Sequence, residues 1–162
     1  MKQELVDMIT ACSSELNDIQ IKLSALPALD KSRSYLTQYA LIRTCGTVEF
    51  VYRSIVADFF DSFPVTQMHT YLEKTVRTGS MSATYENMQA LLGKFDDNWK
   101  SAFKQAVTQH PQRYQIIESA NSLVRNRHTF AHGRVPTATF SDIVNYYNDT
   151  LQLINMFDGV VV

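Results

Sequence analysis

The segment RNRHTFAHG, residues 125–133, places two arginines and two histidines within nine positions and ends on a glycine. If the segment is helical, four polar residues share one face because their spacings are four, three and four. Arginine holds a phosphate through paired hydrogen bonds, and histidine exchanges protons near neutral pH, so together they suit phosphodiester cleavage. A solvated basic helix end, which the helix dipole favours, explains the same spacing without any chemistry. The polar stripe comprises Asn121, Arg125, His128 and His132, with Arg127 to one side of it.

Charge is unevenly distributed along the chain. The formal net charge of −1 argues against a protein that binds nucleic acid over its whole surface. Residues 100–134, however, carry six basic side chains against Glu118 alone, whereas residues 1–99 carry nine basic and twelve acidic ones. The electropositive region therefore contains the RNRHTFAHG segment.

The cysteines and the N-terminal segment predict a cytoplasmic protein. Cys12 and Cys45 lie in helical apolar patterns without CxxC spacing, which is typical of reduced core residues. Glu4 and Asp7 interrupt the segment in which a signal peptide would need an apolar run. No stretch approaches the roughly 18 apolar residues of a membrane span.

No metal or cofactor site is expected. His69 and His110 are isolated in the sequence, and no carboxylate pair or HExxH-like spacing joins them. Each is interpreted as a surface or helix-end histidine. No glycine-rich phosphate-binding loop is present either, which excludes a nucleotide triphosphatase of that type.

Apolar residues recur at helical spacing along most of the chain and predict an all-α protein. We expect a single domain over residues 1–162, built as an up-and-down four-helix bundle with a small helical insertion at about 64–110. Pro27 ends the first helix, and the second, from about Ser34 to Ser62, is apolar on more than one face. That pattern is typical of a central helix.

The last two helices are expected to position the arginines and histidines. A long helix after Pro111 is predicted to bury Tyr114 and to end near His132, because Gly133 suits the position after a helix end. Ser141 or Thr139 is expected to cap the final helix.

Two further groups of residues allow a functional and an ordinary interpretation. Glu49 lies in an apolar run with Arg53 one turn later, which favours an ion pair within the helix at the edge of the core. The alternative is a carboxylate that orients an arginine or histidine of the RNRHTFAHG segment. The aromatic pairs at positions 59–60 and 146–147 could stack on bases, although core or dimer packing is their more ordinary role.

The arginine, polar follower and histidine in a helix that ends in AHG resemble the motif of the HEPN superfamily. The motif fits two registers, since four residues separate Arg127 from His132 and six separate Arg125 from His132, with Asn126 as the more usual follower. Arg127 is favoured as the arginine of the motif because it is contiguous with AHG. Arg125 is favoured because it lies on the same face of a helix as His132. The stretch YALIRTCGTVEFVYRSIVADFF is similar to the second helix of the RiboL-PSP-HEPN branch, where a glutamate has a similar place. SATYENMQALLGKFDDNW resembles that branch's helical insertion, so the resemblance covers about residues 35–158.

This resemblance implies a helical domain that dimerises through its motif-bearing helices, so that both Arg/His sets line one cleft. It implies a metal-independent endoribonuclease of a toxin–antitoxin, phage-defence or RNA-processing system, with RNA and an antitoxin or defence protein as partners. Arg127 or Arg125 would bind the scissile phosphate. His132 would transfer protons as the RNA 2′-hydroxyl attacks, which leaves a 2′,3′-cyclic phosphate and a free 5′-hydroxyl.

Two other functions remain open at this point. A non-catalytic dimeric adaptor of the same fold would bind RNA, a nucleotide or a protein partner, and a purely structural bundle would bind none of them. The complete Arg/His pair favours the enzyme, whereas the acidic overall charge favours the adaptor. The candidate catalytic residues are Arg125, Asn126, Arg127, His128 and His132, with Glu49 and Asn121 in supporting positions.

Overall fold

The chain folds into helices joined by short connections, without a β-strand. A computed structural model describes all 162 residues. The helices are α1 (Gln3–Ala25), α2 (Ser32–Phe59), α3 (Thr66–Leu72), α4 (Tyr85–Gly93), α5 (Asp97–Gln109), α6 (Arg113–Ala131) and α7 (Phe140–Asp158), with a 3₁₀ turn η1 (Phe60–Ser62) and a π-helical segment η2 (Glu73–Arg77). The prediction of an all-α bundle is confirmed.

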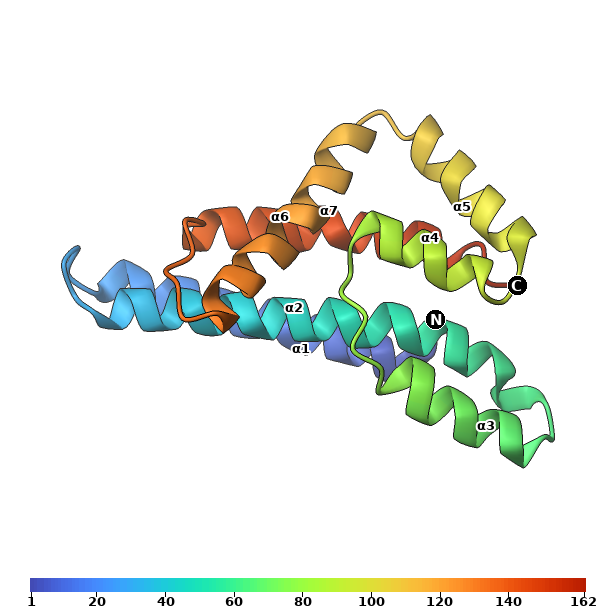
Figure 1. Cartoon of the computed structure of the whole chain (residues 1–162). Coiled ribbons are helices and arrows are strands. Elements are labelled where there is room, and N and C mark those ends of the chain that lie inside the picture. The colour runs from blue at the N-terminus through green and yellow to red at the C-terminus, as the bar shows by residue number, and fades with distance from the viewer.

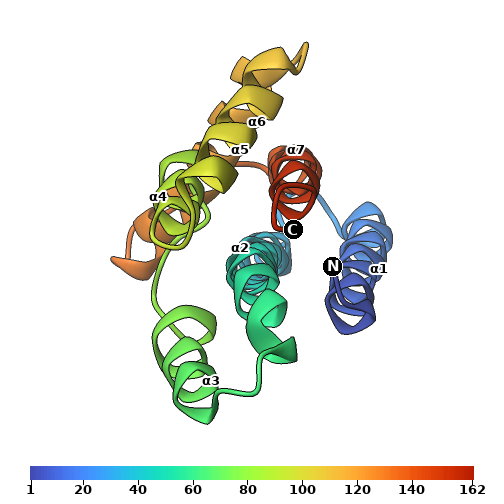
Figure 2. The same ribbon diagram turned by 90° about the vertical axis from the view of Figure 1, so that its right-hand side faces the viewer.

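Helix α2 lies in the middle of the molecule, as its apolar pattern predicted. It packs against α1, α6 and α7 and also contacts η2 and α4 of the insertion. In the end-on view, α1, α7, α4 and α3 surround it (Figure 2). Its buried residues therefore lie on more than one face of the helix.

Helices α1, α2 and α7 run beside one another, and α6 crosses them obliquely (Figure 1). The first turns of α6 project with α5 to one side of the bundle (Figures 1 and 2). The expectation that Tyr114 is buried is therefore wrong. Tyr114 lies on the projecting turn, where it is exposed and only the Arg113 guanidinium lies over its ring.

The insertion shares the core of the bundle. Leu72, Leu92 and Phe103 of the insertion belong to the same buried cluster as the residues of α1, α2, α6 and α7. The aromatic pairs named above also pack inward: Phe59 and Phe60 both contact Trp99. Tyr147 is buried, and Tyr146 packs against the same core. Core packing, the more ordinary of the two roles expected for these aromatic pairs, is therefore the one the structure shows.

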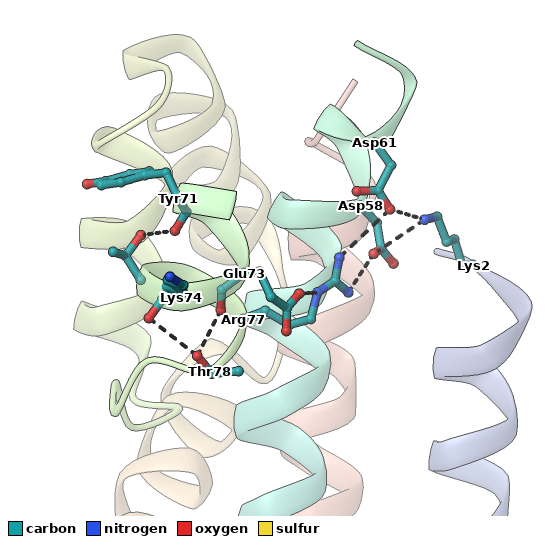
Figure 3. A network of polar contacts seen from close by, with 9 residues as sticks. Lys2, Asp58, Asp61, Tyr71, Glu73, Lys74, Arg77 and Thr78 are labelled. Atoms are coloured by element: carbon teal, nitrogen blue, oxygen red, sulfur yellow. Dashed lines mark hydrogen bonds and ion pairs between the residues drawn. The ribbon is translucent and has the colours of Figure 1, made fainter. Parts of the chain in front are cut away.

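An ionic network anchors the insertion on α2 (Figure 3). Asp58, near the end of α2, accepts a hydrogen bond of 2.7 Å from Nη1 of Arg77 in η2. Arg77 also donates through Nε to Glu73 at 2.8 Å, and Lys2 at the start of α1 pairs with Asp58 and Asp61. The three segments are thus tied together at the end of the molecule that holds the chain termini.

None of the helices combines the length and the apolar character that a membrane crossing requires.

Candidate functional site

The C-terminal half of α6 carries the RNRHTFAHG segment. Buried residues recur along this helix at Ile116, Ala120 and Leu123, with spacings of four and three. Arg127 follows one turn after Leu123 and so continues the face of α6 that packs on the bundle. Arg125 lies on the opposite, solvent-facing side, where it is exposed.

Arg127 meets two other segments of the chain at this point. Its Nη2 atom donates to Oε1 of Glu49 at 2.6 Å and to Oγ of Ser82 at 3.1 Å. The side chains of Arg127 and Glu49 are 26% and 17% exposed, so solvent screens this pair less than it would a fully exposed one. The Nε and Nη1 donors of Arg127 have no partner in the protein, which leaves them available to an anion.

The expected ion pair between Glu49 and Arg53 does not form. The Glu49 carboxylate instead pairs with Arg127, while Nε of Arg53 donates to the backbone carbonyl of Glu49 at 2.8 Å. A partly buried carboxylate needs a cation, and the crossing of α6 over α2 supplies one from another helix. The arrangement matches the alternative interpretation, in which Glu49 orients an arginine of the segment.

The segment before α4 completes this arrangement. Tyr52 of α2 donates its hydroxyl to the carbonyl oxygens of Met81 at 2.9 Å and Ser82 at 3.2 Å. Burial raises the pKa of Tyr52, so this hydroxyl remains a donor. Asn87 of α4 donates to the Ser82 carbonyl at 3.0 Å. Ser82 could not be predicted from the sequence, because no helical spacing rule links an irregular segment to a helix 45 positions away.

Arg125 has a different partner. Its Nη2 atom pairs with Glu118 and donates to Oγ of Ser122 at 2.8 Å. Hydrogen bonding to Arg125 lowers the pKa of Glu118. The two charged side chains are 61% and 64% exposed, which makes this a surface ion pair on α6 itself. Asn121, one turn before Arg125, is half-buried and makes no side-chain hydrogen bond.

His128 and His132 are both exposed, and neither imidazole is hydrogen-bonded to the protein. Helix α6 ends where the sequence predicted: its last helical residue is Ala131, and His132 is the C-cap before Gly133, whose φ is 71°. The amide of Gly133 donates to the Phe130 carbonyl and the amide of Arg134 to that of Thr129, a hydrogen-bond pattern that closes helices. No hydrogen bond within the chain joins either histidine to Arg127.

Asn126 holds the connection that follows α6. Its Oδ1 accepts a hydrogen bond of 3.1 Å from the amide of Ala138, and its Nδ2 donates to the Ser122 carbonyl at 2.9 Å. The next residue, Thr139, caps α7, which decides between the two expected caps. Asn126 thus braces the loop between α6 and α7.

Cys45 shows how closely α2 and α6 pack. Its thiol donates to the Leu123 carbonyl at 3.5 Å. Cys45 lies one turn before Glu49 on α2, and Leu123 lies one turn before Arg127 on α6. Burial raises the pKa of Cys45 to about 12, so the thiol stays neutral. Cys12 is also buried and reduced, as expected for both cysteines.

The two remaining histidines lie at helix ends. His69 is in the last turn of α3, and its Nε2 atom lies 2.6 Å from the Phe63 carbonyl. His110 follows α5 and accepts from the Gln112 amide through Nδ1. No group of three or more histidine, cysteine, aspartate or glutamate side chains is arranged to hold a metal ion.

A comparison with protein-family models matches residues 8–162 to the family described as RiboL-PSP-HEPN. Searches of curated proteins and of solved structures returned no significant match. The matched range begins inside α1 and is longer than the range expected from the sequence motifs. It contains Glu49, Ser82 and the whole RNRHTFAHG segment.

Proposed function

This chain belongs to the RiboL-PSP-HEPN family, and on that premise we propose that it is a metal-independent endoribonuclease that cleaves RNA by attack of a 2′-hydroxyl on the adjacent phosphodiester. One observation carries the proposal. The Arg127 guanidinium is fixed through Nη2 by Glu49 and Ser82, and its Nε and Nη1 donors remain free. A preorganised cation with free donors is what the developing charge on a phosphorane requires.

Arg127 is assigned to the scissile phosphate. Its free donors would bind non-bridging oxygens, and the bond to Glu49 keeps the guanidinium from rotating away when no substrate is bound. Of the two possible registers of the motif, this geometry favours Arg127, because Arg125 is engaged by Glu118 on the opposite side of α6.

Proton transfer is assigned to His132, with His128 as the second imidazole on the same helix end. In the reaction the O2′–P bond forms and the P–O5′ bond breaks. The proton of the 2′-hydroxyl passes to a base, and the leaving 5′-oxygen receives a proton. Both histidines are exposed and make no hydrogen bond to the protein, so either imidazole is free to exchange protons with a substrate.

A second copy of the chain would complete the site. Within one protomer the histidines lie on the solvent side of α6, whereas Arg127 faces α2. A stripe of exposed residues on α2, formed by Tyr35, Ile42 and Gly46, leads directly to Glu49. A Cβ atom at Gly46 would meet no atom within 4 Å, so another helix could approach closely there. We propose a homodimer across α2 and the end of α6.

Incubation of the purified protein with labelled RNA in EDTA tests the proposal. We expect cleavage that leaves 2′,3′-cyclic phosphate and 5′-hydroxyl ends, detected by end-group analysis. His132→Ala and Arg127→Ala should each lower the rate constant by about 100-fold or more, the cost typical of removing one such catalytic group. His110→Ala, which alters a histidine outside the site, is the matched control and should cleave as wild type does.

RNA cleavage that persists in His132→Ala would contradict the assigned mechanism. RNA binding without cleavage by the wild-type protein would instead favour the dimeric adaptor. We place the activity in a toxin–antitoxin or phage-defence system, where expression of the unrestrained wild type should slow growth of the host and expression of His132→Ala should not.

A further inference from the structure

We propose that a pocket beside Arg127 binds the base and phosphate of the RNA nucleotide next to the scissile bond. This inference rests on the proposed ribonuclease function. The pocket has a volume of about 230 Å³ and lies between α2, the α3–η2 segment and α4. Its wall includes Arg53, Tyr71, Met81, Leu91, Lys94 and Phe95.

The positive charge of this pocket is not neutralised. Arg53 uses only Nε, for the Glu49 carbonyl, which leaves both terminal nitrogens of its guanidinium without a partner. Lys94 is exposed and makes no ion pair, and no carboxylate lines the pocket. On the other side of η2, by contrast, Arg77 is surrounded by the carboxylates of the ionic network (Figure 3). Arg53 and Lys94 are therefore free to bind a phosphate in this pocket.

The apolar wall of the pocket suits a flat ring. Leu91 and Val76 are buried at its base, and Phe95 is half-buried. The Tyr71 side chain is 63% exposed, and Figure 3 shows its ring on the side of this helical segment away from Arg77. Aromatic side chains at such a wall bind bases by stacking, without regard to sequence. The volume of the pocket is smaller than that of sites for drug-sized ligands, so the pocket suits a single base.

The pocket and the Arg127 site share neighbouring residues of the chain. Arg53 follows Glu49 by four residues on the same face of α2, about 6 Å along the helix axis. Met81 of the pocket wall directly precedes Ser82, which binds Arg127. We expect an RNA strand that is held at Arg127 by one phosphate to place a neighbouring phosphate at Arg53 and Lys94. The π-helical turn that supplies Thr75 and Val76 to the wall is of a rare type that is frequently found at functional sites.

Binding of a 2′-O-methyl RNA oligonucleotide, which lacks the attacking hydroxyl, tests the pocket without cleavage. Fluorescence anisotropy would give the Kd at several salt concentrations. We expect Arg53→Gln and Lys94→Gln each to raise Kd and to lower the slope of log Kd against log salt by about 0.7, the value for one contact to a single strand. Tyr71→Ala should raise Kd by about tenfold with the slope unchanged, because stacking releases no counterions. Lys74→Gln, an exposed lysine of η2 outside the pocket, is the matched control.

The pocket assignment would be overturned if Arg53→Gln and Lys94→Gln bound the oligonucleotide with the same Kd and the same salt dependence as the wild type. This holds whatever the cleavage assay shows. A free mononucleotide that binds as tightly as the oligonucleotide would also overturn it, since the ligand would then not be an RNA strand. If the pocket variants weaken binding as expected but wild type cleaves no RNA, the proposed nuclease fails while the pocket stands. Thermal unfolding of each variant separates a lost contact from a lost fold.

Discussion

Arg125 and Arg127 stand two positions apart and have opposite surroundings. Arg127 reaches Glu49 and Ser82 from the core-facing side of α6, whereas Arg125 forms an exposed pair with Glu118. Exposed ion pairs contribute little to stability, and an arginine in one is free to move with its partner. Of these two arginines, only Arg127 is held in a fixed orientation by partners on other segments. A fixed orientation lets a guanidinium bind a phosphate without first having to be ordered.

At the residue scale we therefore predict that the two arginines differ in function. Arg127→Ala should lower kcat/KM for RNA cleavage by about 100-fold or more, while Arg125→Ala should change it by less than about threefold. Single-turnover cleavage assays on both variants measure the difference. If Arg125→Ala is the inactive variant, the longer register of the motif is correct and Arg127 is structural.

At the scale of elements, the junction of α6 and α7 decides where the histidines lie. Gly133 closes α6, Asn126 holds the amide of Ala138, and Thr139 then begins α7 through a reciprocal bond with Asp142. Hydrogen bonds from the side chain and backbone of Thr139 lower the pKa of Asp142. The stability that this carboxylate contributes is thus complete above its ordinary pKa of 3.8 and is lost as pH falls through the lower folded value.

Asp142→Asn should therefore lower the free energy of unfolding at pH 7, by about 1 kcal/mol or less as for other caps. The difference between Asp142→Asn and wild type should shrink when the pH is brought below 3.8. Urea unfolding at both pH values measures it. Asp18→Asn, which changes an exposed carboxylate of α1 that makes no hydrogen bond to the protein, is the control and should leave the free energy of unfolding at pH 7 unchanged. An Asp142→Asn effect that is independent of pH would contradict the role of the charged carboxylate.

At the scale of the whole molecule, the exposed stripe on α2 is the proposed contact with a second copy. Gly46 has open space around it in the protomer, so Gly46→Ala should stabilise the isolated chain by about 0.5–1 kcal/mol through helix propensity. If a second helix packs there, the same substitution should weaken dimerisation. Ile42→Asp, at a position 42% exposed, should dissociate the dimer and reduce RNA cleavage.

Sedimentation analysis across a range of concentrations gives the dimer dissociation constant for each variant. Gln20→Asp, on the exposed side of α1 away from this stripe, is the control and should leave the mass unchanged. A wild-type protein that remains monomeric and still cleaves RNA would show that one protomer holds a complete site.

Most of the helical architecture was predictable because local signals carry it. Pro27 and Gly133 predicted the ends of α1 and α6, and the structure has both helices ending there. The broad apolar surface of α2 predicted a central helix, and α2 is buried on more than one face. Tyr114 was misplaced because helical periodicity predicts which face of α6 is apolar but not how far the helix projects beyond its neighbours. The crossing of α6 over α2 depends on packing between segments distant in the sequence.

The sequence by itself determined an all-α chain and the helix end at which the histidines lie, because capping and periodicity act over a few residues. Membership of the RiboL-PSP-HEPN family rests instead on the match of residues 8–162 to the family model. The tertiary structure alone decided that Glu49 pairs with Arg127 rather than Arg53, and that Ser82 joins them. Both choices depend on which side chains three remote segments bring within hydrogen-bonding distance. A partly buried carboxylate such as that of Glu49 needs a cationic partner, and the packing of α6 on α2 decides which cation lies within reach.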